Sequence, residues 1–185
     1  MKSWSLPFIA FLSILICSCK QETLPKPLGQ LRLEYPHATY KPSASPYPFY
    51  FENNTISKVS TQANGSIEIK YPKMKATIYL TYKKVDGNIK SLLRDVQKLT
   101  YNHVIKADDI LEQPYLNPSN KVYGMLYQIN GNAATNAEFY ATDSVKHFLT
   151  GSVYFYVKPN FDSIYPASEY VKKDLRHLME TLKWK

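Results

Sequence analysis

The stretches VYGMLYQIN (residues 122–130) and GSVYFYV (residues 151–157) decide the fold of this 185-residue chain. Successive side chains of an extended strand point to opposite faces, so Val153, Phe155 and Val157 share one face while Tyr154 and Tyr156 share the other. VYGMLYQIN likewise carries large apolar or aromatic side chains on both faces. A strand with one solvated face alternates apolar and polar residues instead. These two strands therefore require cover on both faces of their sheet.

Two amphipathic helices are predicted to provide that cover, one on each face. The first follows the turn residues 86–88 and runs to about Ala107, and the second begins at about Ala167. In both, apolar residues recur with the 3.6-residue period of a helix. The inward-facing positions are Ile89, Leu92, Leu93, Val96, Leu99 and Val104 in the first helix, and Val171, Leu175, Leu178, Met179 and Leu182 in the second.

Further strands complete the predicted sheet. A loop through Asp108, Asp109, Pro114 and Pro118 is expected after the first helix. The order of strands, helix, strands and helix predicts an α+β fold, an antiparallel β-sheet flanked by two helices. By analogy this order looks like the PsbP-like sandwich. The remaining strands are PFYFEN (residues 48–53), SIEIKYP (66–72), KATIYLTYKKV (75–85) and AEFYATD (137–143).

The chain begins with the features of a bacterial lipoprotein signal. Its apolar run from Leu6 to Ile16 suits a secretory signal and is too short to span a bilayer. The run ends in ICSC (residues 16–19), which resembles a lipobox with a small serine before the cut. Residues 1–18 are therefore predicted to be a signal peptide, and Cys19 to be the lipidated first residue of the mature chain. A plain cleaved signal and a Cys17/Cys19 redox pair are the alternatives.

The residues after the signal divide into a tether and one domain. Six of the 12 prolines lie between residues 25 and 48, and proline fixes φ and removes a hydrogen-bond donor. Residues 19–46 are therefore predicted to be the lipidated N-terminus and a proline-rich tether. Inside the tether, Leu31–Tyr35 alternates and is expected to dock as an edge strand. Residues 47–185 are expected to form a single α+β domain.

Charge and aromatic content indicate the kind of partner. The formal net charge is +8, but the basic residues are scattered along the sequence. The signal peptide also predicts a location outside the cytoplasm, so we expect no nucleic-acid partner. Anionic envelope components or an acidic protein fit this charge, and a solvated basic surface without a partner is the alternative. The 16 tyrosines suit protein interfaces and sugar stacking, although half-buried strand faces also use tyrosine.

No constellation of residues predicts a metal site. The four histidines, His37, His103, His147 and His177, are too far apart in sequence for the i, i+4 pair that places two imidazoles on one side of a metal. His103 falls in the apolar stripe of the first helix. A core or boundary histidine is one interpretation of this position, and a ligand or proton-transfer site is the alternative. We expect neither a metal nor a cofactor.

Catalytic groups are equally hard to find. Asp108, Asp109 and Glu112 crowd one predicted loop, where a cation or acid–base site and plain solvation are the alternatives. Ser152 follows Gly151 without the G-x-S-x-G elbow of a serine hydrolase. We therefore predict that the protein is not an enzyme. A hydrolase would need the acidic loop to meet His147 or His103.

Four stretches together resemble the GldD family of gliding-motility lipoproteins of the Bacteroidota. They are PKPLGQLRLEYP (25–36), PFYFEN (48–53), the long block 122–157 and DLRHLMETLKWK (174–185). The resemblance implies an envelope lipoprotein that is required for gliding and associated with type IX secretion, with no assigned enzymatic activity. Other gliding-motility and type IX secretion proteins are the partners it implies.

The expected role is that of a lipid-anchored accessory protein, which acts by protein–protein binding as an assembly or stability factor. A periplasmic glycan-binding or peptidoglycan-binding module is the alternative. We expect an anchor in the outer membrane. In the Bacteroidota an acidic cluster just after the acylated cysteine favours export of a lipoprotein to the cell surface, and only one carboxylate, Glu22, follows Cys19 closely. We therefore expect the domain to face the periplasm. Ser144 and Ser163 lie in Asp-Ser-aliphatic triplets that resemble O-glycosylation acceptors in predicted loops.

Overall fold

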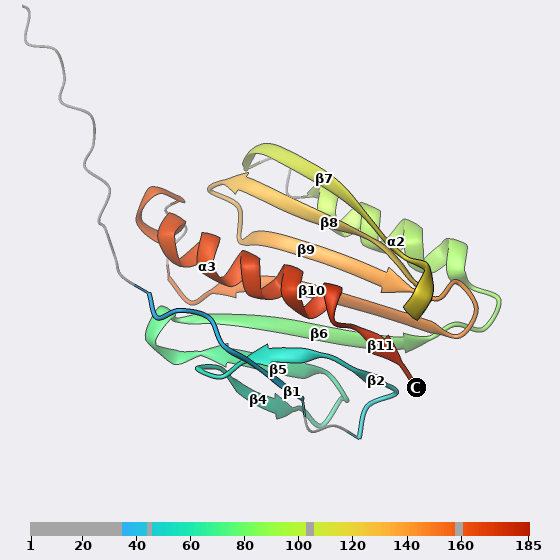
Figure 1. The fold of residues 1–185 in the computed structure, drawn as a ribbon. Helices are drawn as coiled ribbons and strands as arrows, with labels where there is room; N and C mark the ends of the chain where they lie inside the picture. The colour runs from blue at the N-terminus through green and yellow to red at the C-terminus, as the bar shows by residue number, and fades with distance from the viewer. Residues whose placement is uncertain (1–34, 44–45, 103–105, 158–160) are drawn as a thin grey trace, which may run out of the picture.

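The computed structural model describes residues 35–43, 46–102, 106–157 and 161–185. Its centre is a seven-stranded antiparallel sheet with the strand order β4-β5-β6-β10-β9-β8-β7 (Figure 1). These strands are β4 (Lys58–Thr61), β5 (Ile67–Tyr71), β6 (Ala76–Lys84), β7 (Ala107–Asn117), β8 (Val122–Gly131), β9 (Thr135–Thr142) and β10 (His147–Phe155).

Shorter elements surround this sheet. Two pairs of short strands are β1 (Tyr40–Pro42) with β3 (Glu52–Asn54), and β2 (Phe49–Tyr50) with β11 (Lys183–Trp184). The helices are α2 (Ile89–Tyr101) and α3 (Phe161–Glu180), with the 3₁₀ turns η1 (Pro72–Met74) and η3 (Pro118–Asn120). Within the part of the chain that the structure describes, no helix combines the length and the apolar character needed to cross a membrane.

The two helices cover opposite faces of the sheet, as the sequence predicts (Figure 1). Leu126 belongs to the core under α3, and its neighbour Tyr127 belongs to the core under α2. Leu149 and Phe148 divide in the same way. Adjacent residues of a strand point to opposite faces, so the two cores lie on the two sides of one sheet. The prediction of an antiparallel sheet flanked by two helices is confirmed.

The larger core lies on the α3 side. All five inward positions predicted for this helix are at most 1% exposed. Phe49 and Phe51, from the segment before β4, are buried in the same cluster. Burial of a side chain of this size is worth about 2 kcal/mol, so this layer supplies most of the hydrophobic stabilisation. The buried positions on α3 are Val171, Leu175, Leu178 and Met179, with Leu182 just after the helix.

The core on the α2 side is smaller, and one predicted position is wrong there. Leu92 and Val96 are buried, but Leu99 is 61% exposed. Thr100, one residue and about 100° further round the helix, faces the sheet instead and is fully buried. The predicted inward Val104 lies outside the described residues, as does His103.

Three predicted boundaries are corrected by the structure. Helix α2 ends at Tyr101 and not at about Ala107, and the expected loop from Asp108 is the 11-residue strand β7. Charged residues and proline favour a loop in sequence, but an edge strand tolerates both because one side of its backbone has no strand partner. Helix α3 begins at Phe161 and contains Pro166. The Phe161 N–H donates to Asn132 Oδ1 at 2.9 Å, which caps the helix earlier than expected.

The N-terminal part of the described chain is folded against the domain. Strand β1 lies inside the range assigned to the tether, yet it pairs with β3 from Tyr40 to Pro42. The predicted edge strand Leu31–Tyr35 falls outside the described residues except for Tyr35, which is not in a strand. The folded part therefore begins before residue 47.

Candidate functional site

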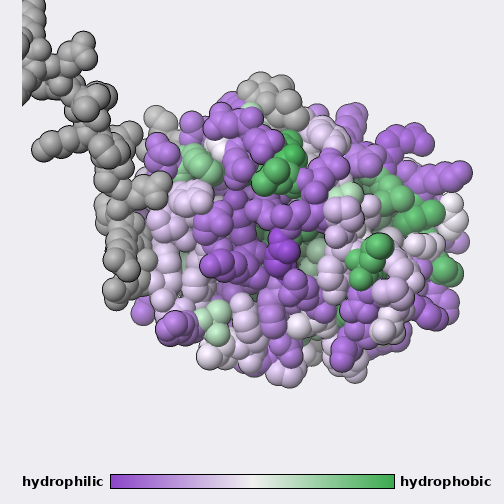
Figure 2. All heavy atoms as spheres, turned by 45° about the horizontal axis from the view of Figure 1, so that its top comes forward, coloured by the Kyte–Doolittle hydropathy of each residue, from purple (hydrophilic) through white to green (hydrophobic). Residues whose placement is uncertain are grey.

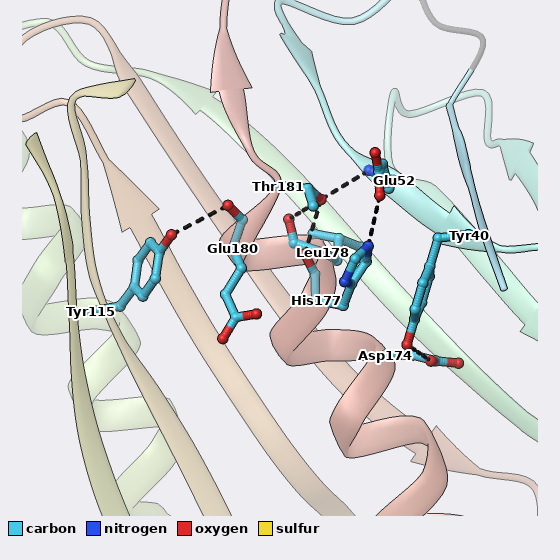
Figure 3. A network of polar contacts seen from close by, with 8 residues as sticks. All are labelled: Tyr40, Glu52, Tyr115, Asp174, His177, Leu178, Glu180 and Thr181. Carbon is cyan, nitrogen blue, oxygen red and sulfur yellow. Dashed lines mark hydrogen bonds and ion pairs between the residues drawn. The ribbon is translucent and has the colours of Figure 1, made fainter. Parts of the chain in front are cut away.

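A buried carboxylate on α3 joins the first described segment to the domain. Asp174 is 3% exposed and accepts a hydrogen bond from the Tyr40 hydroxyl at 2.7 Å (Figure 3). It also accepts one from Asn54 Nδ2 at 2.9 Å. The Tyr71 hydroxyl also bonds to Asp174. These donors come from β1, β3 and β5, so one side chain of α3 ties three strands together. We call Asp174, Tyr40, Asn54 and Tyr71 the carboxylate junction.

The electrostatics of the junction keep its phenols neutral. Burial, together with the neighbouring Asp174 carboxylate, raises the pKa of Tyr40 and of Tyr71 well above the ordinary tyrosine value. Both hydroxyls therefore remain protonated at physiological pH and act as donors. No lysine or arginine is needed to satisfy the carboxylate, because hydrogen bonds from hydroxyl and amide groups do so.

A second layer of contacts surrounds the junction. The rings of Tyr40 and His177 stack with centroids 3.5 Å apart, and His177 Nε2 lies 2.8 Å from Glu52 Oε2 (Figure 3). The Glu52 backbone N–H donates to Thr181 Oγ1 at 3.1 Å. The residues that lead towards the predicted lipid anchor are thus held firmly on α3. The carboxylate junction has a structural role.

The surface best suited to a partner lies on the other side of the sheet. Helix α2 packs over β7 to β10, where its apolar side chains meet Tyr127 and Phe148, and it leaves the β5–β6 half of this side uncovered (Figure 1). Tyr156, just after β10, is 60% exposed. We define the open tyrosine face as Glu68, Lys70, Tyr79, Tyr154 and Tyr156.

The three tyrosines of this face interact with one another. Tyr79 and Tyr154 meet edge to face with centroids 5.7 Å apart, and the hydroxyls of Tyr79 and Tyr156 are hydrogen bonded. This hydrogen bond, followed by burial, raises the pKa of Tyr79 to about 12. Lys70 Nζ lies 2.7 Å from Glu68 Oε2 beside them. A preordered aromatic cluster that needs little further ordering is typical of protein interfaces.

The acidic residues of β7 do not meet His147. In the sheet register Phe148 is level with Leu116, through Thr142 and Tyr123, so His147 lies at the Asn117 end of β7. Asp109 lies at the other end, eight residues away, which is about 26 Å along a strand. The hydrolase arrangement with His147 is therefore not formed. The alternative arrangement with His103 lies outside the described residues.

His147 has structural neighbours instead. Its ring stacks on Trp184 with centroids 5.0 Å apart, and its Nδ1 lies 3.0 Å from the Tyr82 hydroxyl. Glu112 of β7 accepts a hydrogen bond from the Tyr101 hydroxyl at the end of α2. Among the described residues, no three histidine, cysteine, aspartate or glutamate side chains are close enough to hold a metal ion.

Sequence reasoning missed two buried carboxylates. Asp174 follows the inward position 171 by three residues, so it lies in the apolar stripe of α3, which is a signal for a buried polar contact. Glu138 on β9 is 9% exposed and accepts a hydrogen bond from Thr100 Oγ1 at 2.9 Å. Its position between apolar strand residues was the available signal.

The predicted modification sites differ in their surroundings. Ser144 is exposed in the turn between β9 and β10, at a φ of 68°, which agrees with the predicted loop. Ser163 lies in the first turn of α3, so the prediction of a loop there is wrong, because the helix begins six residues early. Cys19 lies outside the described residues. O-glycosylation and lipidation stay predictions.

We expect the β9–β10 turn to show a pH-dependent contribution from Asp143. Partial burial alone raises the pKa of Asp143, but three backbone N–H groups that donate to its Oδ1 lower the pKa below its ordinary value. A carboxylate with a lowered folded-state pKa stabilises above its unfolded pKa, about 4, and loses this stabilisation as the pH falls through the folded value. Asp143→Asn should therefore cost about 1 kcal/mol of unfolding free energy at pH 7 and progressively less below pH 4. Urea unfolding across pH checks this, and a pH-independent difference contradicts it.

Comparison with known proteins agrees with the sequence resemblance. No curated protein and no solved structure matches the chain, so the PsbP-like likeness stays a prediction. The model of one family, the gliding motility lipoprotein GldD, matches residues 20–184. That match extends from just after Cys19 through nearly all of the domain. The chain therefore belongs to the GldD family of gliding motility lipoproteins.

Proposed function

We propose that this protein is a lipid-anchored accessory factor that binds other proteins of gliding motility and type IX secretion and keeps them assembled. Membership in the family supports the role in motility. The open tyrosine face supports action by binding, because it presents three ordered tyrosines beside a charged pair on an uncovered half of the sheet. A partner bound only in its folded state is stabilised in proportion to its occupancy.

The experiment that tests this proposal removes two of the three rings of the face, the exposed Tyr156 and the half-buried Tyr154. Tyr154→Ala combined with Tyr156→Ala should weaken partner binding at least about 30-fold, since a single tyrosine hot spot at an interface is worth about 2 kcal/mol. Crosslinking from envelope membranes identifies the partner, and its abundance and the spreading of colonies are measured in parallel. Both should fall together.

A matched control uses two exposed tyrosines elsewhere. Tyr50 on β2 and Tyr101 at the end of α2 are 51% and 47% exposed. Tyr50→Ala combined with Tyr101→Ala should leave crosslinking and gliding unchanged. If a folded Tyr154→Ala, Tyr156→Ala variant glides normally with a normal partner level, the open tyrosine face is not the binding surface.

A panel of single substitutions separates a scaffold from an enzyme. Asp108→Asn, Asp109→Asn, His103→Gln and His147→Gln should each leave gliding largely intact, because an interface of many contacts tolerates the loss of one group. A catalyst fails when one essential group is removed. If one isosteric change stops gliding while the protein and partner levels stay normal, the result would support an enzymatic function instead.

We expect Cys19→Ala to separate anchoring from folding. The acyl groups hold the mature chain at the membrane, because each buried methylene contributes about 0.8 kcal/mol. We propose that this membrane is the outer membrane and that the domain faces the periplasm. The fraction of the protein that pellets with membranes should be at least about tenfold lower for this variant. Its circular dichroism and urea midpoint should stay unchanged, since the described core contains no cysteine. Continued palmitate labelling of the variant would contradict the lipobox.

The tyrosines also support a second candidate, a glycan-binding or peptidoglycan-binding module. Sugars stack on exposed aromatic faces, and Tyr156 is the most exposed ring of the open tyrosine face. Sedimentation with purified sacculi separates the two candidates. Co-sedimentation that Tyr156→Ala abolishes would favour the glycan.

A further inference from the structure

An apolar groove lies where the described chain enters the fold. It has a volume of about 580 Å³, and Tyr35, the first described residue, forms part of its wall. This end of the molecule, where β5 turns into β6, lies opposite the C-terminus (Figure 1). The volume falls in the range of roughly 300–1,000 Å³ that is usual for small-molecule sites. The remaining lining residues are Pro36, Ile56, Lys58, Tyr71, Pro72 and Lys73.

The chemistry of the groove combines apolar walls with positive charge. Ile56 is 39% exposed although it is aliphatic, and the two lysines are exposed. Among the residues that the structure describes, two cations and no carboxylate line the groove. Apolar and aromatic surface flanked by lysine is the pattern that suits the boundary between acyl chains and phosphate headgroups.

The predicted anchor places a membrane within reach of this groove. Tyr35 follows Cys19 by 16 residues, so the two are separated by at most about 55 Å even in a fully extended chain. A linker that spans such a distance holds its two ends at an effective concentration near the millimolar range. A groove with weak intrinsic affinity for lipid is therefore substantially occupied when the chain is anchored.

We propose that this groove binds a phospholipid of the membrane that carries the anchor, with an acyl segment along Ile56 and Tyr71 and the phosphate beside Lys58 and Lys73. The bound lipid orients the domain with its tether end on the membrane. The open tyrosine face lies on the far side of the sheet from α3. In this orientation it stands roughly perpendicular to the membrane surface and stays available to a partner. This inference rests on the lipid anchor of the proposed function.

The surface around strand β7 is less suited to an anionic membrane than the groove is. On the face that Figure 2 shows, which brings β7 forward, apolar side chains gather in small separate groups among hydrophilic ones. Strand β7 carries the exposed Leu111 and Leu116, but its charged residues are Asp108, Asp109 and Glu112. Carboxylates repel an anionic leaflet, so this edge does not compete with the groove for lipid.

The test uses the full mature chain with Cys19→Ser, so that no acyl group contributes. Sedimentation with vesicles of phosphatidylcholine and phosphatidylglycerol in equal parts should show binding that is lost on pure phosphatidylcholine. Lys58→Gln with Lys73→Gln should lower the partition coefficient about 30-fold, because each lysine near an anionic surface is worth about fivefold. Ile56→Ser should lower it about fivefold.

The opposite end of the sheet provides matched controls. Lys83 and Lys84 are exposed at the far end of β6, and Val145 is 68% exposed in the β9–β10 turn. Lys83→Gln with Lys84→Gln, which removes the same charge, should change binding less than about threefold. Val145→Ser should have no effect. Equal losses from the two lysine pairs would show a diffuse basic surface and overturn the proposal.

Two further outcomes would also overturn it. The first is the absence of binding to anionic vesicles at a millimolar concentration of accessible lipid, which matches the effective concentration that the anchor provides. The second is a rise in vesicle binding with Leu31→Ser and Leu33→Ser, which would mean that the chain's own lead segment fills the groove. Because vesicle binding is measured without the acyl group or a protein partner, its failure is distinct from a failure of the motility variants.

Discussion

Asp174→Ala is expected to lower the free energy of unfolding by about 3 to 5 kcal/mol, a large share of the stability of a domain of this size. The variant removes a 3% exposed carboxylate and leaves the donors of Tyr40, Asn54 and Tyr71 without their acceptor. Each buried donor left unsatisfied costs about 1 to 3 kcal/mol. Urea unfolding followed by circular dichroism measures the change.

Graded variants distinguish the junction from simple loss of packing. Asp174→Asn keeps an acceptor and the volume, so it should cost less than the alanine variant. Tyr40→Phe removes one donor and its hydrogen bond to Asp174, but leaves no donor unpaired, so it should cost about 1 kcal/mol. Asp162→Asn, in the exposed first turn of the same helix, serves as the control and should stay within about 0.5 kcal/mol. An alanine cost below that of Tyr40→Phe would show that the carboxylate does not hold the strands together.

The second large effect is expected at Gly151 in the middle of β10. A Cβ atom at this position would lie 2.2 Å from Phe139 Cε1 and 2.9 Å from Leu80 Cδ2, and both of those side chains are buried. Gly151→Ala should therefore cost about 3 kcal/mol, since overpacking a close-packed core forces side chains out of their rotamers. The measurement is again the urea midpoint at constant m-value.

A double-mutant cycle identifies the clash as the cause. Phe139→Leu removes the ring that occupies the space, so the combination with Gly151→Ala should cost about 1 to 2 kcal/mol less than the sum of the single variants. Ser152→Ala, the next residue on the opposite face, should change stability by less than about 0.5 kcal/mol. Additive costs in the cycle would contradict the close approach of Phe139 and the β10 backbone.

The sequence by itself determined the features that depend on local periodicity. The alternation in residues 122–130 and 151–157 required two covered faces, and the inward positions of α3 from Val171 to Met179 are buried as predicted. Side-chain direction repeats every two residues in a strand and every 3.6 in a helix, so each segment records its own apolar side. Family membership could likewise be read from the residues, and the match to residues 20–184 confirms it.

Only the tertiary structure decided which segments lie next to one another. Strand β7 resembled a loop because it contains Pro114 and several carboxylates. An edge strand tolerates these residues, but the edge position of β7 follows only from its pairing with β8. Strand β10 returns to pair with β6 across a long stretch of intervening chain, and this return sets which half of the sheet α2 leaves open. Asp174, Tyr40 and Tyr71 are far apart in sequence and meet only because the fold places α3 against β3, where Asp174 reaches residues of β1 and β5. Contacts of that kind carry no local period, so the carboxylate junction, the open tyrosine face and the groove at Tyr35 emerge only when the layers are assembled.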